Sequence, residues 1–327
     1  MIAFGPAPSR RLGRSLGINN IPAKTCTYSC VYCQLGRTPA LQTAVRYYFP
    51  PARIIQEVWQ RASCLCELGQ HVDYLTVVPD GEPTLDRRLG ETLRLLKRNF
   101  RVKTAVITNG SLLWREDVRE ALSTCDWLSI KVDACTEATW RKINRPHPHL
   151  ELERILEGIL QMAGDFDGEL VTETMLIRGV NDGESDVGAL AEVLSVLQPA
   201  TAYLAVPTRP PAERWVQAPE EAVVNGVFQR LSSRLPRVEL LTGFEGSDFG
   251  YSGNPEQDLL SLASVHPLRE DAANEWLKNA GADWSLLSTL LREGRMVELE
   301  YNGRKFYLRN LHQEPKHAAL SVAAGEE

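Results

Sequence analysis

Three cysteines near the start of the chain, Cys26, Cys30 and Cys33, have types and spacing suited to metal chemistry. The spacing C-x3-C-x2-C allows three thiolates on one loop to converge on the same metal centre. The residues before them carry no apolar stretch typical of a secretory signal, so metal explains the triplet better than disulfides do. A structural zinc or an electron-transfer cubane normally takes four protein ligands. Three ligands therefore predict a centre with one open metal position, where a reaction can take place.

The triplet, with the aromatic Tyr32 directly before Cys33, resembles the signature of the radical S-adenosylmethionine (radical SAM) superfamily. The resemblance implies that the three cysteines hold a 4Fe-4S cluster, and that the methionyl amine and carboxylate of SAM chelate the fourth iron. Reduction of such a cluster cleaves a carbon–sulfur bond of SAM and gives a 5′-deoxyadenosyl radical. The alternative is a zinc knuckle or a simple ferredoxin whose missing ligand lies elsewhere in the chain.

Length and composition are those of a globular protein. The 327 residues, 43% of them hydrophobic, suffice for one large domain and one small domain. No uninterrupted apolar run approaches the roughly 20 residues of a membrane helix, so we expect a cytoplasmic protein without a membrane partner. The net charge of −6 gives no general attraction to nucleic acid, so such binding needs a local basic patch. No pattern indicates an oligomeric state.

Four further cysteines bring the total to seven, an odd number that argues against a disulfide framework. We interpret Cys64, Cys66 and Cys125 as small buried hydrophobic side chains. Cys135 directly follows a predicted strand and is the candidate catalytic side chain. Its thiol has three alternatives: hydrogen-atom donation to a substrate radical, covalent attachment of a group, or simple packing.

The elements that must position these residues alternate between helices and strands. The predicted helices cover residues 52–68, 87–100, 115–123, 150–162, 187–197 and 221–235. The predicted strands cover residues 72–78, 103–107, 127–132, 170–177, 201–206 and 238–241. Repeated strand–helix units require a parallel sheet, so we predict an α/β fold with a partial (β/α)6 TIM barrel in residues 1–246. Residues 4–24, rich in Gly, Pro and Arg, are predicted to be irregular apart from a short strand at 15–18.

Polar residues follow successive predicted strands, at the end of the sheet where ligands collect in such folds. They lie in residues 80–84, 108–111, 129–133 and 173–182. A single cluster of this kind would be ordinary turn chemistry, because Gly, Asn and Asp are common turn residues. Several successive clusters predict a shared pocket.

The resemblance to the radical SAM superfamily extends over residues 4–246 and implies roles for these residues. Gly81 and Glu82 occupy the place of the glycine-rich segment that holds the methionyl amine, although Asp80 departs from the usual small residue. Lys131 and Asp133 match the strand whose polar groups meet the methionyl carboxylate or the ribose. The alternative for Lys131 is an ordinary lysine at a strand end. The predicted cofactor-binding residues are Tyr32, Gly81, Glu82, Pro83, Thr108, Asn109, Ser129, Lys131, Asp133 and Glu173.

Residues 131–134, 140–146 and 176–182 carry a narrower resemblance, to the group of radical enzymes that includes the tRNA wyosine synthases. Those enzymes build a tricyclic base on a tRNA guanine. The chain departs from them, because no cysteine precedes Cys26 to hold a second cluster and Lys24 is the only lysine there that could bind pyruvate as an imine. The resemblance suggests RNA as a macromolecular substrate, whereas the departures favour a peptide, a protein or a small metabolite.

The end of the chain is predicted to form a linker at residues 247–256, a small domain at 257–312 and a disordered tail at 313–327. Helices at 257–264, 269–279 and 284–292, followed by a hairpin around Asn302-Gly303, are typical of a winged helix-turn-helix. The third helix begins at Asp283 and offers little to phosphates. We therefore expect this domain to grip a substrate macromolecule or to pack on the barrel rather than to read DNA.

Together these patterns predict a radical SAM enzyme, an iron–sulfur oxidoreductase or transferase that receives electrons from a donor of flavodoxin or ferredoxin type. An RNA base is one hypothesis for the substrate, and a peptide, protein or small metabolite is the alternative. A further hypothesis is a redox-sensing transcription regulator whose cluster controls DNA binding through the winged helix. The acidic start of the third helix counts against it.

Overall fold

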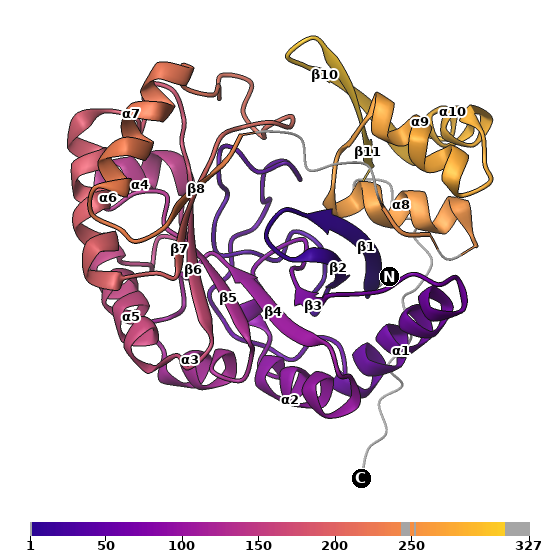
Figure 1. Cartoon of the computed structure of the whole chain (residues 1–327), viewed down its shortest axis with the longest axis horizontal. Helices are drawn as coiled ribbons and strands as arrows, with labels where there is room; N and C mark the ends of the chain where they lie inside the picture. The colour runs from indigo at the N-terminus through magenta and orange to yellow at the C-terminus, as the bar shows by residue number, and fades with distance from the viewer. Residues whose placement is uncertain (1, 243–248, 252, 311–327) are drawn as a thin grey trace.

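The structure, a computed structural model, describes residues 2–242, 249–251 and 253–310 (Figure 1). An α/β fold is built on one curled sheet of eight strands: β1 (Ala3–Ser9), β2 (Gly13–Ile18), β3 (Tyr74–Val77), β4 (Lys103–Thr108), β5 (Trp127–Lys131), β6 (Glu169–Met175), β7 (Thr201–Ala205) and β8 (Val238–Leu241). Their order in the sheet follows their order in the chain. β1 pairs antiparallel with β2, and all later neighbours are parallel. The sheet forms a half-barrel whose two edges are β1 and β8.

Helices connect the parallel strands: α1 (Pro51–Glu67), the 3-10 helix η1 (Pro83–Leu85), α2 (Leu89–Asn99), α3 (Glu116–Leu122), α4 (Glu137–Asn144), α5 (Leu152–Asp165), α6 (Glu184–Leu197) and α7 (Glu221–Ser232). The helices α1, α2, α3, α5, α6 and α7 lie on the outer face of the sheet (Figure 1). This arrangement follows from the right-handed crossovers that parallel strands require. Within the described ranges, no helix has the length and apolar character needed to cross a membrane.

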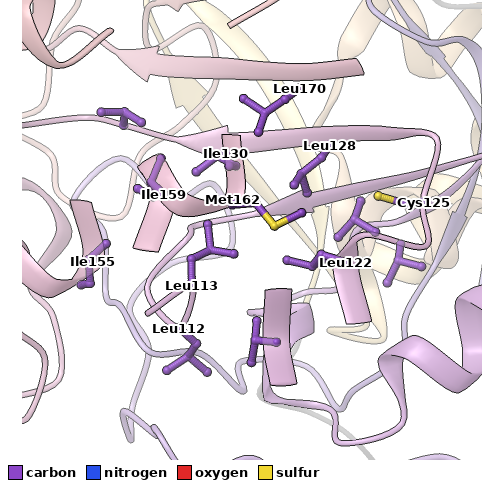
Figure 2. Close-up of a cluster of buried hydrophobic side chains, with 14 of the residues drawn as sticks. Leu112, Leu113, Leu122, Cys125, Leu128, Ile130, Ile155, Ile159, Met162 and Leu170 are labelled. Atoms are coloured by element: carbon purple, nitrogen blue, oxygen red, sulfur yellow. The ribbon is translucent and has the colours of Figure 1, made fainter. Parts of the chain in front are cut away.

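The main apolar core lies between the sheet and these helices (Figure 2). Ile155, Ile159 and Met162 project from one face of α5 because their spacing follows the helical repeat. They pack beside Leu128 and Ile130 of β5, which point outward from the barrel. Since successive side chains of a strand face opposite sides, the residues between and beside them on β5 point into the barrel. Outward packing on β5 therefore aims its alternate side chains at the barrel interior.

The predicted alternation is confirmed, with element ends that differ from the prediction by at most three residues. The short strand predicted at 15–18 is confirmed as β2, but the prediction that the remainder of residues 4–24 is irregular was wrong, because Ala3–Ser9 forms β1 although it contains Pro6 and Pro8. β1 lies at an edge of the sheet, where prolines are tolerated because one side of the strand needs no partner. Helix α4 was also missed, because its two large buried apolar residues, Trp140 and Ile143, are too few for a helical pattern.

Residues 255–310 form a second unit, here named the C-terminal unit. It contains α8 (Pro255–Val265), β9 (Leu268–Arg269), α9 (Glu270–Asn279), α10 (Trp284–Arg292), β10 (Met296–Tyr301) and β11 (Arg304–Arg309). The three helices and the hairpin occur where they were predicted, and β11 also pairs with the short β9. The unit has an apolar cluster of its own, centred on Leu262, Trp276 and Leu287. Its assignment to the winged-helix class stays a prediction.

The predicted linker and tail are described only in part. Residues 243–248, which span the end of the predicted barrel and the start of the predicted linker, and residue 252 within the linker lie outside the described residues. Helix α8 begins at Pro255, so the last two positions of the predicted linker belong to that helix. The predicted tail at 313–327 lies outside the described residues as well. The proposed domain boundaries therefore stay predictions.

The C-terminal unit contacts the barrel on both sides of the opening between its edges (Figure 1). On one side α8 packs on β1, and Asp258 of α8 forms a buried ion pair with Arg61 of α1. The Arg61 guanidinium also donates to the carbonyl oxygen of Gly5 in β1, at 2.8 Å from Nε. On the other side, the Tyr301 hydroxyl donates to the carbonyl oxygen of Pro207, which follows β7, at 3.3 Å. The unit thus contacts the edge strand β1 on one side and the segment after β7 on the other.

We predict that Asp258→Ala lowers the free energy of unfolding by about 3–5 kcal/mol, because it leaves the buried Arg61 guanidinium without its carboxylate. Urea unfolding followed by circular dichroism measures this change. Arg53→Ala is the matched control on the same helix, since Arg53 pairs with Glu57 at the surface and its loss should cost below about 1 kcal/mol. Equal losses for both variants would contradict the importance of the buried pair.

Candidate active site

The three cysteines lie on a segment, residues 26–33, that neighbouring segments hold from two sides; we name it the cluster loop. At its start, the backbone N–H of Glu82 donates to the carbonyl oxygen of Thr25 at 2.9 Å. Further along, the N–H of Val31 donates to the carbonyl oxygen of Ile143 in α4 at 2.9 Å. Gly81 makes the first contact possible, because a Cβ at this position would lie 2.0 Å from the Thr25 oxygen. The loop is therefore placed by the segment after β3 and by α4.

The thiols of the cluster loop lie close enough to interact with one another. Burial raises the pKa of Cys26 to about 12 and that of Cys30 still further, and Cys33 contributes to both shifts through its charge. Two amides are directed at these sulfurs: Asn144 Nδ2 lies 3.5 Å from Cys30 Sγ, and Asn109 Nδ2 lies 3.7 Å from Cys26 Sγ. Such N–H donors favour the thiolate form, which is the form that binds metal.

This donor set fits an iron–sulfur cluster. In a cubane each thiolate binds a different iron, so the sulfurs surround the centre at separate positions. Three sulfurs on one loop, with amides directed at two of them, suit the cluster.

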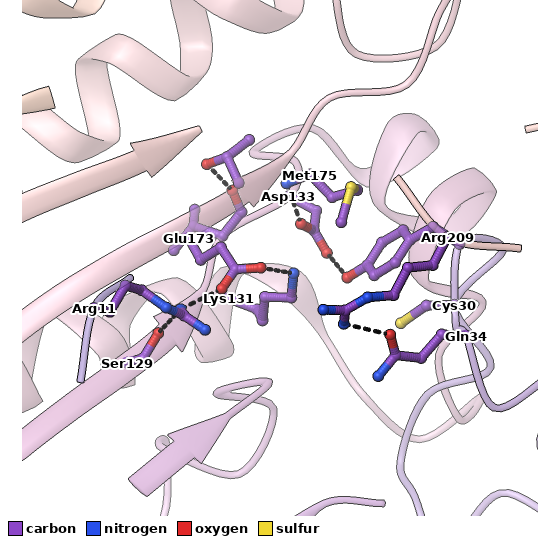
Figure 3. Close-up of polar contacts among 12 residues, drawn as sticks. Arg11, Cys30, Gln34, Ser129, Lys131, Asp133, Glu173, Met175 and Arg209 are labelled. Carbon is purple, nitrogen blue, oxygen red and sulfur yellow. Dashed lines mark hydrogen bonds and ion pairs between the residues drawn. The ribbon is translucent and has the colours of Figure 1, made fainter. Parts of the chain in front are cut away.

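A polar cluster inside the barrel mouth joins the cluster loop to the ends of β5 and β6 (Figure 3). The Tyr32 hydroxyl donates to Oδ2 of Asp133, which lies two residues after the end of β5. Asp133 also accepts from Asn144 Nδ2 at 2.8 Å and from the backbone N–H of Met175 at 2.9 Å. Lys131 Nζ lies 4.9 Å from the centre of the Tyr32 ring. One carboxylate therefore orients groups from the cluster loop, α4 and β6.

Glu173 lies deeper in the barrel and binds two cations (Figure 3). Its Oε1 lies 2.7 Å from Lys131 Nζ, and its Oε2 pairs with the guanidinium of Arg11. Burial alone would raise the pKa of Glu173, but Lys131 and Arg11 outweigh burial and lower it to about 2. Burial alone would lower the pKa of Lys131, but its carboxylate neighbours outweigh this and raise it. Both side chains are therefore charged at neutral pH.

Arg11 reaches Glu173 from the opposite end of the barrel. It comes from the turn between β1 and β2, and its guanidinium lies 5.8 Å from the Trp127 ring and 5.7 Å from the Tyr203 ring. Trp127 is the first residue of β5, whereas Lys131 is its last. A line of paired charges thus runs inside the barrel, from the amino ends of the strands to their carboxyl ends.

The structure brings Glu82, Thr108 and Asn109 together, as the sequence predicted for neighbouring strand ends. Glu82 is 1% exposed, and its Oε1 accepts from the hydroxyls of Thr84 and Thr108, both at 2.6 Å. Its Oε2 accepts from the backbone N–H of Asn109 at 2.8 Å. This carboxylate cross-links the ends of β3 and β4, and Pro83 beside it begins the short helix η1. Its predicted contact with the methionyl amine stays a prediction.

Two other predicted site residues lie away from the mouth. Ser129 is fully buried, and its hydroxyl is 3.5 Å from Arg11 Nη1, so it faces the guanidinium deep in the barrel. Cys135 is partly buried and packs against the main apolar core, and burial raises its pKa to about 12. These surroundings fit the packing alternative for Cys135. Cys125 is buried as expected, but the expectation for Cys66 was wrong, because it is exposed on α1.

Sequence reasoning assigned no site role to Asn144, Arg11 or Arg209. Asn144 lies within the stretch 140–146 that carried the narrower resemblance, so a signal existed. Arg11 belongs to an arginine-rich segment for which no single partner could be chosen. Arg209 Nη1 donates to Oε1 of Gln34, directly after the cluster loop, at 2.9 Å (Figure 3). Its Nη2 lies 3.1 Å from Nε2 of His266 in the C-terminal unit. No pattern in the sequence indicated this link.

Asp80 makes stability depend on pH. It is 6% exposed, and burial raises its pKa to about 7 against the opposing charges of Arg309 and Lys24. The unfolded chain releases this proton near pH 3.9, so between about pH 4 and pH 7 the folded state binds more protons and stability falls as the pH rises. Through this group the free energy of unfolding of the native protein falls by about 2–3 kcal/mol between pH 5 and pH 8. We predict that Asp80→Asn abolishes this fall. Urea unfolding of both proteins at the two pH values measures this, and parallel pH profiles would refute it.

Comparison with known proteins identifies the family. Residues 20–191 match the model of the radical SAM superfamily. A UPF0026 protein of Methanocaldococcus jannaschii is 42% identical over 97% of this chain and 99% of its own length. A UPF0026 protein of Helicobacter pylori is 29% identical over 94% of this chain and 97% of its own.

Solved structures show the same fold. A structure of TYW1 with a lysine-pyruvate adduct bound gives a TM-score of 0.54 at 19% identity, covering 68% of this chain and 74% of that one. A radical SAM methyltransferase from Sphaerobacter thermophilus gives 0.52 at 18% identity, covering 70% and 66%. Members of this superfamily bind a 4Fe-4S cluster and SAM. With its triplet of cysteines on a loop at the mouth of a half-barrel, the chain belongs to the radical SAM superfamily.

Proposed function

We propose that this protein is an enzyme that cleaves SAM reductively and directs the resulting radical at a substrate. The observation that carries the proposal is the link between the cluster loop and the polar cluster: Tyr32 lies between two cluster cysteines in the sequence and donates its hydroxyl proton to Asp133. When bound, the cluster and SAM supply a 5′-deoxyadenosyl radical, the chemistry of the superfamily. The chain supplies the groups that hold and orient SAM.

Lys131 and Asp133 keep hydrogen-bonding capacity for SAM. The Lys131 ammonium has three N–H donors and directs one at Glu173, which leaves donors for the methionyl carboxylate. The Asp133 carboxylate has about four acceptor positions, of which Tyr32, Asn144 and the Met175 N–H occupy three. The remaining position suits a ribose hydroxyl. Because its partners are donors, Asp133 is held in one orientation before SAM binds.

The rim of the barrel mouth supports an RNA base as the substrate. The segment after β7 lies against the cluster loop, since the N–H of Glu213 donates to the carbonyl oxygen of Val31 at 3.0 Å. In this segment Trp215 is 46% exposed and lies next to the exposed Arg214. An exposed aromatic side chain that follows an exposed arginine in the sequence suits a base that must leave its stack to reach an enzyme site. The narrower resemblance to wyosine synthases points to the same substrate class.

The first test is anaerobic reconstitution with iron and sulfide, followed by dithionite and SAM, with 5′-deoxyadenosine detected by mass spectrometry. We expect product from the native chain and none from Cys30→Ala, because two remaining thiolates cannot hold the cluster. Cys66→Ala is the control, since this exposed cysteine lies on α1 and should leave product formation unchanged. A native chain that binds no iron–sulfur cluster would overturn the proposal.

The RNA hypothesis predicts a gel shift that weakens steeply with salt, because phosphate contacts release counterions. Trp215→Ala should weaken binding about 5-fold or more, since stacking of one base contributes about 1–3 kcal/mol. Trp59→Ala is the matched control, because Trp59 is 48% exposed but lies on the outer helix α1 against Phe100. Absence of any shift at low salt, or equal weakening by both substitutions, would favour the peptide, protein or metabolite alternative.

A further inference from the structure

The side chain of Asn144, the last residue of α4, lies between a cluster cysteine and a carboxylate of the polar cluster. Its Nδ2 atom is 3.5 Å from Cys30 Sγ and 2.8 Å from Asp133 Oδ2. A side-chain amide nitrogen carries two hydrogen atoms, so Asn144 can donate one to each acceptor. A thiolate that binds metal and a carboxylate are both negatively charged. One amide, on a side chain that is 3% exposed, is therefore shared by two anionic groups of the site.

The backbone around Asn144 is fixed to the cluster loop by contacts that do not use its side chain. The N–H of Ser29 donates to the carbonyl oxygen of Asn144 at 3.0 Å. One turn earlier on α4, Trp140 Nε1 donates to the Tyr28 hydroxyl at 3.1 Å. These contacts remain possible when the Asn144 side chain is replaced. The role of the amide can therefore be separated from the anchoring of the loop.

Asn109 offers a comparison within the same site. Its Nδ2 lies 3.7 Å from Cys26 Sγ, so it is also directed at a cluster sulfur. Its second acceptor is the hydroxyl oxygen of Thr27, at 2.8 Å, which is neutral. Both amides can stabilise a thiolate, but of the two it is Asn144 that shares its donors with a carboxylate.

The two oxygens of Asp133 have different surroundings. Oδ2 accepts from Asn144 and from the Tyr32 hydroxyl, whereas Oδ1 accepts from the backbone N–H of Met175 at 2.9 Å. The acceptor position left for SAM in the proposed function is therefore on Oδ1. A hydrogen bond formed there draws charge from the carboxylate, so Oδ2 holds the Asn144 amide less strongly. The amide then donates more strongly to Cys30.

We infer that Asn144 is a positioning residue that couples the carboxylate facing SAM to the reduction of the cluster. The inference rests on the proposed function, since it requires a cluster on Cys26, Cys30 and Cys33 that is reduced in use. Reduction adds one electron, and thus one negative charge, with no atom transferred. Hydrogen bonds to the cysteine sulfurs stabilise the added charge and raise the reduction potential. Asn144 therefore makes the cluster easier to reduce, and more so once Asp133 accepts from a further donor.

This coupling favours reduction when the SAM site is occupied. An electron taken up without SAM cannot be used for cleavage and can pass to oxygen instead. A ribose hydroxyl on Asp133 would free the Asn144 amide for Cys30, so the cluster is most readily reduced when SAM is in place. The link between the two sites is one side chain.

The test is an anaerobic redox titration of the reconstituted protein without SAM, with dithionite as the reductant and electron paramagnetic resonance as the readout. Iron and sulfide contents are measured first for every variant. Asn144→Leu keeps nearly the same side-chain shape and removes both donors. Asp133→Asn removes the carboxylate charge, and it is made in the native and the Asn144→Leu backgrounds to form a double-mutant cycle. Asn109→Leu is the matched third background, because it removes an amide that is directed at Cys26 and Thr27.

We expect Asn144→Leu to lower the equilibrium constant for reduction about 10-fold, which is about 59 mV for a one-electron couple. Asp133→Asn should raise the potential, because it removes a negative charge and releases the Asn144 amide to Cys30. In the Asn144→Leu background this increase should be smaller, since no amide is left to release. In the Asn109→Leu background it should keep its full size.

A native potential in Asn144→Leu, or an equal increase from Asp133→Asn in all three backgrounds, would overturn the inference and leave the proposed function intact. If the leucine variant assembles no cluster, the same titration of Asn144→Ala decides. Loss of the cluster from both Asn144 variants would also overturn the inference, by showing that the residue holds the cluster rather than tunes it. A native chain with no reducible cluster would overturn the proposed function itself.

Discussion

Glu173 holds together two cations that come from opposite ends of the barrel. A buried carboxylate without partners would cost several kcal/mol, so the turn that carries Arg11 and the end of β5 that carries Lys131 are both fixed relative to β6. Because Glu173 and Asp133 raise its pKa, Lys131 stays a cation at the mouth with donors left for a ligand. The antiparallel β1–β2 hairpin departs from the strand–helix repeat. Its turn carries Arg11, which binds Glu173, and Glu173 in turn binds Lys131 at the other end of the sheet.

The cluster loop has little regular structure and takes its shape from its neighbours. Gly81 allows the segment after β3 to approach its start, and the end of α4 holds its middle. Asn144 donates to both Cys30 and Asp133, and Tyr32 donates to Asp133 from within the loop. A cluster ligand and the carboxylate expected to face SAM are therefore parts of one hydrogen-bonded assembly, in which a shift of either would displace the other.

The strand–helix alternation, the cysteine triplet and the polar strand ends could be predicted because each is encoded by residues close together in the chain. The fold of β1 could not, since its prolines are acceptable only at a sheet edge, which the sequence does not reveal. The role of Arg11 depends on Glu173, 162 positions away, and several carboxylates were equally plausible partners. Cys66 follows the buried Leu65 by a single position on α1, and one position is enough to turn a side chain from the core to solvent. The substrate is encoded least directly, because it depends on the shape and charge of loops.

The ion pair between Arg61 and Asp258 also sets an order of events during synthesis of the protein. The two residues are 197 positions apart, so at about 5–20 residues per second the ribosome makes Asp258 roughly 10 to 40 seconds after Arg61. During that interval the cysteines have already been made, while the edge of β1 still lacks α8 and Arg209 has not met His266. The cysteine loop and its neighbours on the barrel are thus made before the end of the chain can dock on β1.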